Sequence, residues 1–179
     1  MASGSQDINF QRQAATPPDH LFLCMRQLNI GTEKAWQKIK HFCGYQERNH
    51  KEVKEKLYGY GLYKTEVEQL ISQLIEENYL NEERYAIAYA GGKFRMRQWG
   101  KVKIRYEMKG KGLSDYLVKV GLKAIDEEAY EKTLQQLAEA KLSTLKVETN
   151  VFIRRKKLQQ YLLQKGYETD RITAIVNRV

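Results

Sequence analysis

A glycine-centred pattern that occurs three times constrains the fold more than any other feature of this sequence. Gly61, Gly112 and Gly166 lie 51 and 54 residues apart, and aligning them superimposes apolar positions before and after each glycine. Of 18 aligned sites 17 are apolar, whereas the overall apolar content of 42% predicts roughly seven or eight. We therefore interpret the pattern as a tandem repeat.

Each copy of the pattern predicts a hairpin of two helices, because apolar positions three and four residues apart share one helix face. The glycine is expected where the first helix ends, with a positive φ that costs glycine little. Ser114 is a good N-cap for the helix that follows Gly112. Tyr63 and Glu168, at the equivalent sites, are poorer caps.

The fold class predicted from these features is all-α. Only Pro17 and Pro18 interrupt the chain, and no run of alternating apolar residues indicates a strand. We predict an elongated array of three tandem three-helix repeats, in which each repeat contacts mainly its neighbours. The predicted boundaries are a poorly ordered N-terminal arm at 1–32, repeat 1 at 33–78, a basic repeat 2 at 79–125, and repeat 3 at 126–179.

Finer expectations follow for single segments. Asn81 is predicted to cap a helix in which Tyr85, Ala88 and Tyr89 face inward, and Gly91-Gly92 is predicted to weaken or bend that helix. In the arm, Met25 is a second candidate for the first residue of the protein, so the sequence leaves open whether residues 1–24 are native. Helices are also expected over 47–60, 65–78, 126–145, 150–165 and 169–179.

The positive charge of the chain is concentrated in one segment. Of the net charge of +9, residues 93–111 carry +7, from eight basic residues and Glu107, and the other 160 residues carry +2. Such a concentration indicates a surface for a polyanion or an acidic protein face. With a second basic cluster at 154–157 and Trp99, it gives the candidate DNA- or protein-binding residues: Arg95, Arg97, Trp99, Lys101, Lys103, Arg105, Lys109, Lys111, Arg154, Arg155, Lys156 and Lys157.

Spacing supports a binding role for the basic helix. Lys101, Arg105 and Lys109 fall on one flank, where like charges repel by a few tenths of a kcal/mol per pair and no acid on that flank relieves them. An anionic partner would relieve this repulsion. An ordinary solvated face is the alternative, and Trp99 either stacks on a base or a partner, or packs locally. Arg154 and Arg155 are expected to be exposed.

No catalytic chemistry is indicated by the sequence. It lacks a phosphate-binding loop, a nucleophile elbow and the His-Glu-x-x-His and Cys-x-x-Cys motifs. His41, Cys43 and His50 match no standard metal-ligand spacing, so neither metal nor cofactor is predicted. Two cysteines, no signal peptide and no apolar run near 18 residues indicate a cytoplasmic protein without a membrane segment. We predict a protein that is not an enzyme.

Three features of the sequence are typical of a known family: the segment Asn78 to Ala86, the run Trp99-Gly100-Lys101-Val102-Lys103-Ile104 leading to Met108 and Gly112, and the triple repeat itself. With these features, the sequence from about Thr32 to the C-terminus resembles the RecX family. Two residues depart from the usual family pattern: Asn81 stands where aspartate is usual, and Lys101 where proline is frequent. Both residues are compatible with a helix start.

The resemblance implies a regulator that binds the RecA recombinase. Such a protein lies along the groove of the RecA–DNA filament and inhibits its recombinase and ATPase activities, and so acts in DNA repair, recombination and the SOS response. Weak, salt-sensitive contact with single- or double-stranded DNA and a monomeric state are expected. The alternatives are a stand-alone nucleic-acid-binding repeat protein, acting through a hairpin such as 101–125, and a helical scaffold whose charge only keeps it soluble.

Overall fold

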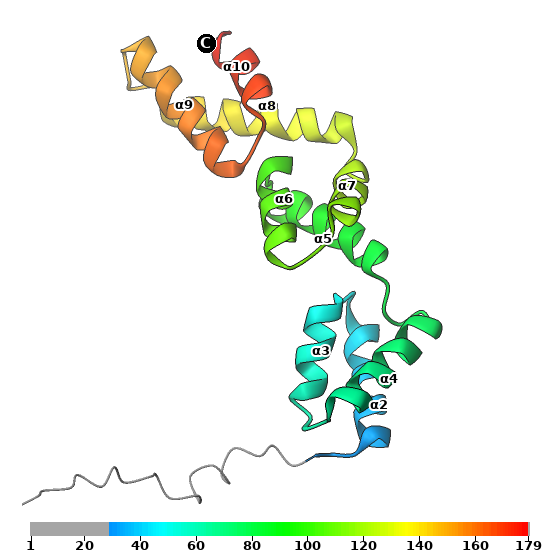
Figure 1. The fold of residues 1–179 in the computed structure, drawn as a ribbon. Coiled ribbons are helices and arrows are strands. Elements are labelled where there is room, and N and C mark those ends of the chain that lie inside the picture. Colours follow the sequence, from blue (N-terminus) through cyan, green and yellow to red (C-terminus); the bar gives the residue numbers. More distant parts are fainter. Residues whose placement is uncertain (1–28, 179) are drawn as a thin grey trace, which may run out of the picture.

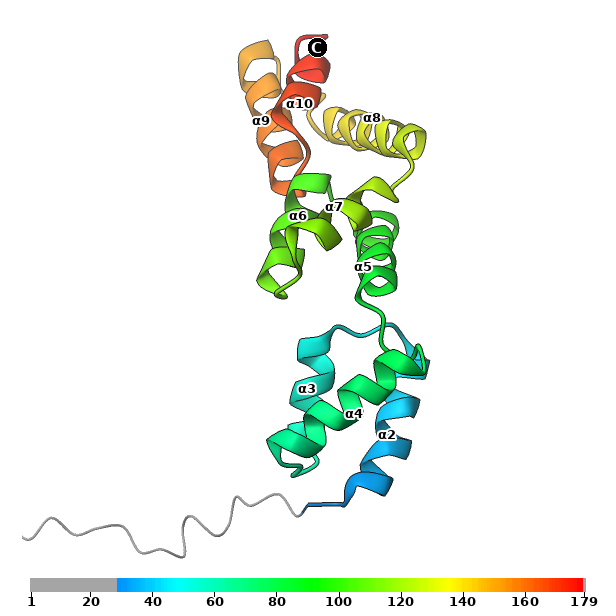
Figure 2. The same cartoon turned by 45° about the vertical axis from the view of Figure 1, so that its right-hand side comes forward.

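The computed structural model describes residues 29–178, which form nine helices and no strand. The helices succeed one another in groups of three, and the groups are stacked into an elongated array (Figures 1 and 2). The all-α tandem-repeat fold is confirmed. Most of the predicted arm, residues 1–28 with Met25, lies outside the described residues. The helices are α2 (Thr32–Tyr45), α3 (His50–Tyr58), α4 (Lys64–Glu76), α5 (Glu82–Arg97), α6 (Lys101–Gly110), α7 (Asp115–Lys123), α8 (Glu127–Thr144), α9 (Val151–Lys165) and α10 (Thr169–Val176).

The aligned glycines behave as the repeat predicts. Gly61, Gly112 and Gly166 have φ values of 79°, 84° and 87°, which allow the chain to reverse between the second and third helix of each group. The apolar residues eight and four before each glycine, and one and six after it, are all buried. The repeat frame is therefore the frame of the hydrophobic core.

The one aligned site that is not apolar has a structural reason. Gly121 lies on α7 where this helix packs against α5, and a Cβ atom there would be 2.6 Å from the carbonyl oxygen of Ala86. A larger side chain would separate the two helices, so the close approach explains glycine at this site.

Helix α5 corrects one expectation, that Ala88 faces inward. It is continuous through Gly91-Gly92 and ends only at Gln98, which has a φ of 53°. It buries Tyr85, Ala86, Ala90 and Phe94, while Ala88 is exposed. Packing along the whole of this face keeps the two glycines helical despite their low helix propensity.

Side-chain caps set several helix starts. Asn81 and Ser114 cap α5 and α7 as predicted. Helix α3 begins later than expected, because the Oδ1 atom of Asn49 accepts a hydrogen bond of 2.7 Å from the backbone N–H of Glu52. At Tyr63 the carboxylate of Glu66 accepts the backbone N–H at 2.7 Å, so the third helix residue compensates for a poor cap.

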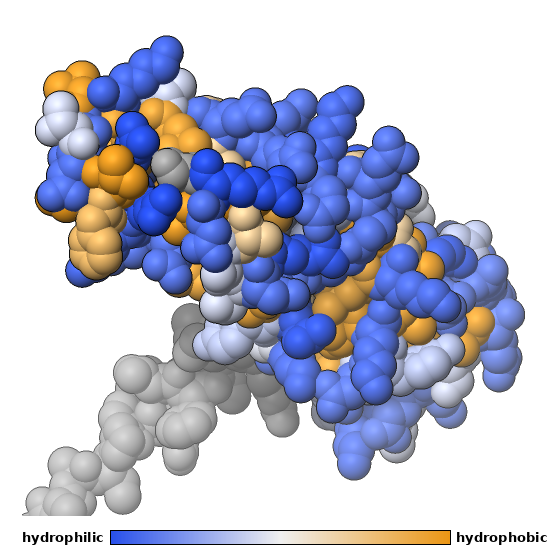
Figure 3. Space-filling model, turned by 90° about the horizontal axis from the view of Figure 1, so that it is seen from above, coloured by the Kyte–Doolittle hydropathy of each residue, from blue (hydrophilic) through white to orange (hydrophobic). Residues whose placement is uncertain are grey.

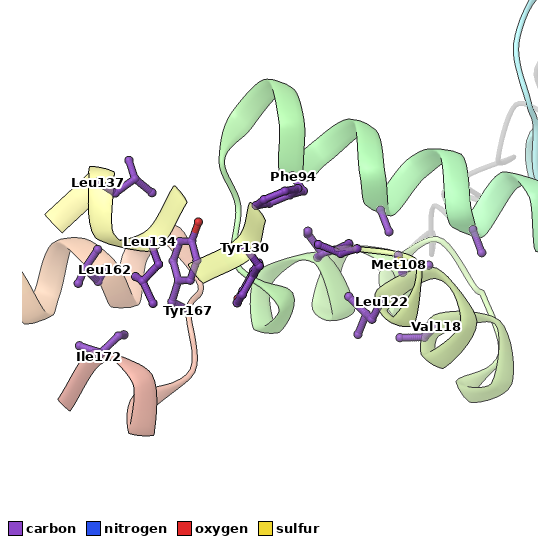
Figure 4. Packing of buried hydrophobic residues seen from close by; sticks show 14 of the residues in the cluster. Phe94, Met108, Val118, Leu122, Tyr130, Leu134, Leu137, Leu162, Tyr167 and Ile172 are labelled. Carbon is purple, nitrogen blue, oxygen red and sulfur yellow. The ribbon is translucent and has the colours of Figure 1, made fainter. Parts of the chain in front are cut away.

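The buried side chains form two clusters rather than three. One lies within α2–α4 and extends to Leu80, and the other joins α5–α7 with α8–α10. In the second cluster Tyr130 lies between Phe94 and Tyr167, with ring centroids 5.6 Å and 5.0 Å away (Figure 4). Repeats 2 and 3 thus share one core, whereas repeat 1 has its own.

Candidate functional site

The basic helix α6 begins at a junction with repeat 3. The backbone N–H groups of Gly100 and Val102 donate to the carbonyl oxygens of Lys165 and Gly166, at 2.9 and 3.0 Å. The N–H of Lys101 donates to the hydroxyl of Tyr130 at 2.9 Å. Carbonyls from the end of α9 thus satisfy the first N–H groups of α6. This helix start is already occupied and offers no free anion site.

Two glycines make this junction possible. A Cβ atom on Gly100 would lie 2.1 Å from the carbonyl oxygen of Gly166, and one on Gly166 would lie 2.2 Å from the Cβ of Lys103. Neither distance is compatible with a side chain. Gly100, the residue after Trp99, therefore allows close contact between repeats 2 and 3.

Trp99 packs locally. Its indole is partly buried against the core shared by repeats 2 and 3. The ammonium groups of Lys93 and Lys103 lie 5.1 and 4.7 Å from its ring centroid, within the range of cation–π contacts. The structure therefore favours local packing of Trp99 over a role in stacking on a base or a partner.

Acids from other helices neutralise several of the candidate lysines. Lys101 contacts Glu127 at 2.6 Å, Lys109 contacts Asp115 at 2.8 Å, and Lys111 contacts Glu52 at 2.9 Å. The hydrogen bond from Lys101 is the main cause that lowers the pKa of Glu127, and that from Lys109 lowers the pKa of Asp115. The expectation that no acid relieves the repulsion along α6 is therefore wrong. Spacing within a helix reveals only the acids of that helix, whereas these acids lie on other helices.

Three arginines among the candidates differ from these lysines. Arg95, Arg97 and Arg105 are exposed, and none of them forms an ion pair within residues 29–178. Exposed Met96, Val102 and Tyr106 lie beside them in sequence. We call Arg95, Arg97 and Arg105 the free arginine set.

The second basic cluster, at the start of α9, is mixed. Arg155 and Lys156 are exposed, and neither is ion-paired within the described residues. Lys157 contacts Glu148 at 2.8 Å, and Arg154 is partly buried instead of exposed as expected. Seen from above, the surface is largely hydrophilic, and hydrophobic patches lie on the right-hand half and also on the left, where the α8–α9 turn lies in Figure 1 (Figure 3). Exposed Val147 and Phe152 belong to this part of the chain.

One face of the hairpin considered for base reading is used for the core. Helix α7 buries Val118, Gly121 and Leu122, and it packs on α5 through Gly121. The buried face of α7 is therefore unavailable to base edges, and the exposed face carries Asp115, Tyr116, Lys119 and Lys123.

Other sites are limited in the described chain. Within residues 29–178 no His, Cys, Asp and Glu group is arranged to hold a metal ion, and no helix has the length and apolar character to span a membrane. Cys43 is buried, and burial raises the pKa of its thiol to about 11. His41 and His50 are exposed.

Two family models match the chain over most of repeats 2 and 3. The model described as the second three-helix domain of RecX matches residues 81–122, and the model of the third three-helix domain matches residues 128–176. Together these segments make up half of the chain.

Sequence and structure comparisons agree with the family models. The chain is 36% identical over 133 residues to a regulatory protein RecX from Clostridium perfringens, and 34% identical over 134 residues to one from Clostridium botulinum. These matches cover 74% and 73% of this chain and 62% of each relative, so the chain spans less than two thirds of their length.

Two solved structures share the fold. The crystal structure of RecX from Lactobacillus salivarius superimposes with a TM-score of 0.74 and 24% identity, covering 82% of this chain and 95% of the other. A second crystal structure of a regulatory protein RecX gives a TM-score of 0.72 and 18% identity, with 92% and 80% covered. The chain belongs to the RecX family.

Proposed function

We propose that this chain is a regulator that binds the RecA recombinase and the RecA–DNA filament and inhibits recombinase and ATPase activity. The proposal draws on family membership and on the elongated array, which offers a long surface to a filament. It implies a monomer that acts in the cytoplasm in DNA repair, recombination and the SOS response. In this role the chain needs no catalytic group or cofactor of its own.

The observation that carries the DNA-contact part of the proposal is the free arginine set. Arg95, Arg97 and Arg105 come from two successive helices of the middle repeat and are exposed without an acid partner in the described chain. Arginine binds phosphate oxygens through a planar fork of donors. Contacts of this kind give sequence-tolerant, salt-sensitive binding.

The ion-paired lysines contribute less in this proposal. Lys101 and Lys109 would have to exchange Glu127 and Asp115 for a phosphate, so part of the new attraction is offset by the lost one. The proposed surface is therefore centred on arginines, with Arg155 and Lys156 as a second basic group near the start of α9 in repeat 3.

A titration of RecA activity tests the proposal. Rising concentrations of the purified chain should lower DNA-dependent ATP hydrolysis and strand exchange by RecA. Replacing Arg95, Arg97 and Arg105 together by glutamate should raise the concentration needed for half inhibition by about tenfold or more at low salt. The matched control replaces the exposed Lys119, Lys123 and Lys132 by glutamate, which changes the net charge equally and should shift it by less than about threefold.

The titration also separates the alternatives. If RecA activity stays unchanged at every concentration, the proposed function is wrong. If both triple variants lose inhibition equally, net charge rather than the free arginine set is responsible. Sequence-selective DNA binding in the absence of RecA would instead support the stand-alone nucleic-acid-binding protein.

A further inference from the structure

A concavity of about 510 Å³ opens on repeat 1, and none of its lining comes from the basic helix α6. Helix α2 and the segment from Arg48 to Tyr60 form its walls. Cationic and aromatic side chains dominate the lining, which includes His41 but no carboxylate. The cations are Lys38, Arg48 and Lys56, and the aromatic residues are Phe42, Tyr45 and Tyr60.

The three cations converge on two rings. Lys38 and Lys56 lie over the ring of Tyr60, with Nζ atoms 5.7 and 5.6 Å from its centroid. Arg48 and Lys56 lie over Phe42, at 3.9 and 5.6 Å. Lys56 therefore links both rings, and three positive charges surround one small area.

No carboxylate neutralises this group of charges. Within residues 29–178, neither Lys38, Arg48 nor Lys56 forms an ion pair, in contrast to Lys101 and Lys109 of the basic helix. The side-chain oxygen of Gln46, in the amide orientation that satisfies both groups, accepts from the two terminal nitrogens of Arg48 at 2.6 and 3.3 Å, and this amide leaves the positive charge of Arg48 in place. Repulsion among the three cations would be relieved by an anion.

Tyr45 adds a planar surface beside these charges. Its side chain is 79% exposed, at the C-terminal end of α2 and one turn after His41, and it enters no aromatic pair within the described residues. A phosphate next to a planar base is the ligand chemistry that combines a strong anion with an aromatic face.

We propose that this concavity binds a nucleotide unit of a single-stranded nucleic acid. Lys38, Arg48 and Lys56 hold the phosphate, and the base stacks on the exposed ring of Tyr45. The site is additional to the free arginine set and does not depend on RecA, so it goes beyond the proposed function. It lies outside the family-model matches, which begin at residue 81.

The test measures binding of a labelled oligothymidylate by the full chain at low salt, without RecA. Replacing the exposed Lys38 and Lys56 by glutamate should weaken binding by about tenfold. The matched control replaces Lys34 and Lys54, which are exposed on the same two helices but do not line the concavity. This control should weaken binding by less than about threefold.

Stacking is tested by a second pair of variants. Tyr45→Ala should weaken oligothymidylate binding by about fivefold or more, whereas Tyr63→Ala, at an exposed tyrosine outside the concavity, should leave it unchanged. An abasic oligonucleotide should bind wild type more weakly than oligothymidylate and should not respond to Tyr45→Ala.

Three outcomes would overturn the proposal. The first is an equal loss of oligothymidylate binding in the two lysine-pair variants, and the second is unchanged binding in Tyr45→Ala. The third is tighter binding of polyglutamate than of oligothymidylate, which would indicate an acidic protein partner. Thymidine monophosphate, added as competitor, distinguishes the source: competition below millimolar concentration indicates a free nucleotide instead of a strand. Because RecA is absent, failure here leaves the proposed regulation of RecA untouched.

Discussion

The two junctions between repeats differ in what joins them. Repeats 2 and 3 share the aromatic contacts of Phe94, Tyr130 and Tyr167 and the backbone hydrogen bonds between Gly100 and the end of α9. Lys101 of repeat 2 adds an ion pair to Glu127 of repeat 3, at 2.6 Å. The junction is thus a continuous core.

Repeats 1 and 2 are joined mainly by polar side chains. The Nε atom of Arg84 contacts Glu47 at 2.7 Å, and Lys111 contacts Glu52 at 2.9 Å. Buried Asn49 donates to the hydroxyl of Tyr85 at 3.4 Å, and the chain passes between the repeats through Asn78, whose φ is 58°. The buried cluster of repeat 1 extends only to Leu80, before α5 begins, and no buried hydrophobic cluster of the described chain contains residues from both α2–α4 and α5–α7.

The comparison shows that the same repeat pattern can join neighbouring repeats either strongly or weakly. A shared apolar core gains free energy in proportion to buried area, whereas partly exposed ion pairs contribute about 0–1 kcal/mol each and are screened by salt. Repeat 1 should therefore open independently of repeats 2 and 3, and more readily at high salt.

The largest effect is expected from breaking the close junction. Gly100→Ala places a Cβ atom against the backbone of Gly166, so α6 and α9 must separate, at a cost of about 3 kcal/mol or more in the free energy of unfolding. The control Gly92→Ala lies inside α5 with nothing within 4 Å of the new atom and should stabilise by about 1 kcal/mol. Chemical denaturation measures both, and equal effects would contradict the close junction.

A smaller loss is expected from Tyr130→Phe. The hydroxyl of Tyr130 accepts from the N–H of Lys101 and donates to Glu168 at 2.7 Å, so its removal leaves a backbone donor unpaired, costing about 1–2 kcal/mol. Tyr116→Phe, at an exposed tyrosine, should cost nothing measurable. A loss of stability in Tyr116→Phe but not in Tyr130→Phe would contradict these hydrogen bonds of the Tyr130 hydroxyl.

The same tyrosine gives a pH dependence. Burial raises the pKa of Tyr130 above its ordinary value of 10, so the folded protein keeps a proton that the unfolded chain releases. The resulting stability is complete below pH 10 and is lost as the pH rises above it, by about 1.4 kcal/mol per pH unit for this group. Tyr130→Phe should reduce that slope in alkaline denaturation, although Tyr167, whose pKa burial also raises, retains part of it.

The smallest effect is expected at the polar junction. A double-mutant cycle of Lys111→Met and Glu52→Gln should give a coupling of about 0.5–1 kcal/mol at low salt that falls as salt rises. The hydrogen bond to Glu52 is the main cause that raises the pKa of Lys111. A coupling that does not depend on salt would show that the pair is more enclosed than the structure indicates.

Much of the fold could be predicted because the repeat frame records burial. Val53, Ile104 and Leu158 stand at equivalent sites, and all three are fully buried, as are their partners one turn later. Helix boundaries were less accurate where a local hydrogen bond decides them, as at Asn49. That contact depends on a single side chain and leaves no periodic signal.

The candidate site was less accessible to sequence reasoning. Lys101 finds Glu127 and Lys111 finds Glu52, pairs that are 26 and 59 residues apart, so no local spacing could show that these charges are neutralised. The concavity of repeat 1 could not be predicted from runs of charge, because its cations are scattered among acids along the chain. Cations alternating with Phe42, Tyr45 and Tyr60 were the available signal.

Native-state hydrogen exchange across a denaturant series tests the two-core account most directly. Amides of α2–α4 should exchange through one opening of lower free energy, because their core is smaller, and those of α5–α10 through a second, higher one. Added salt should widen the gap between the two. A single opening that exposes all nine described helices together, at every salt concentration, would contradict the account.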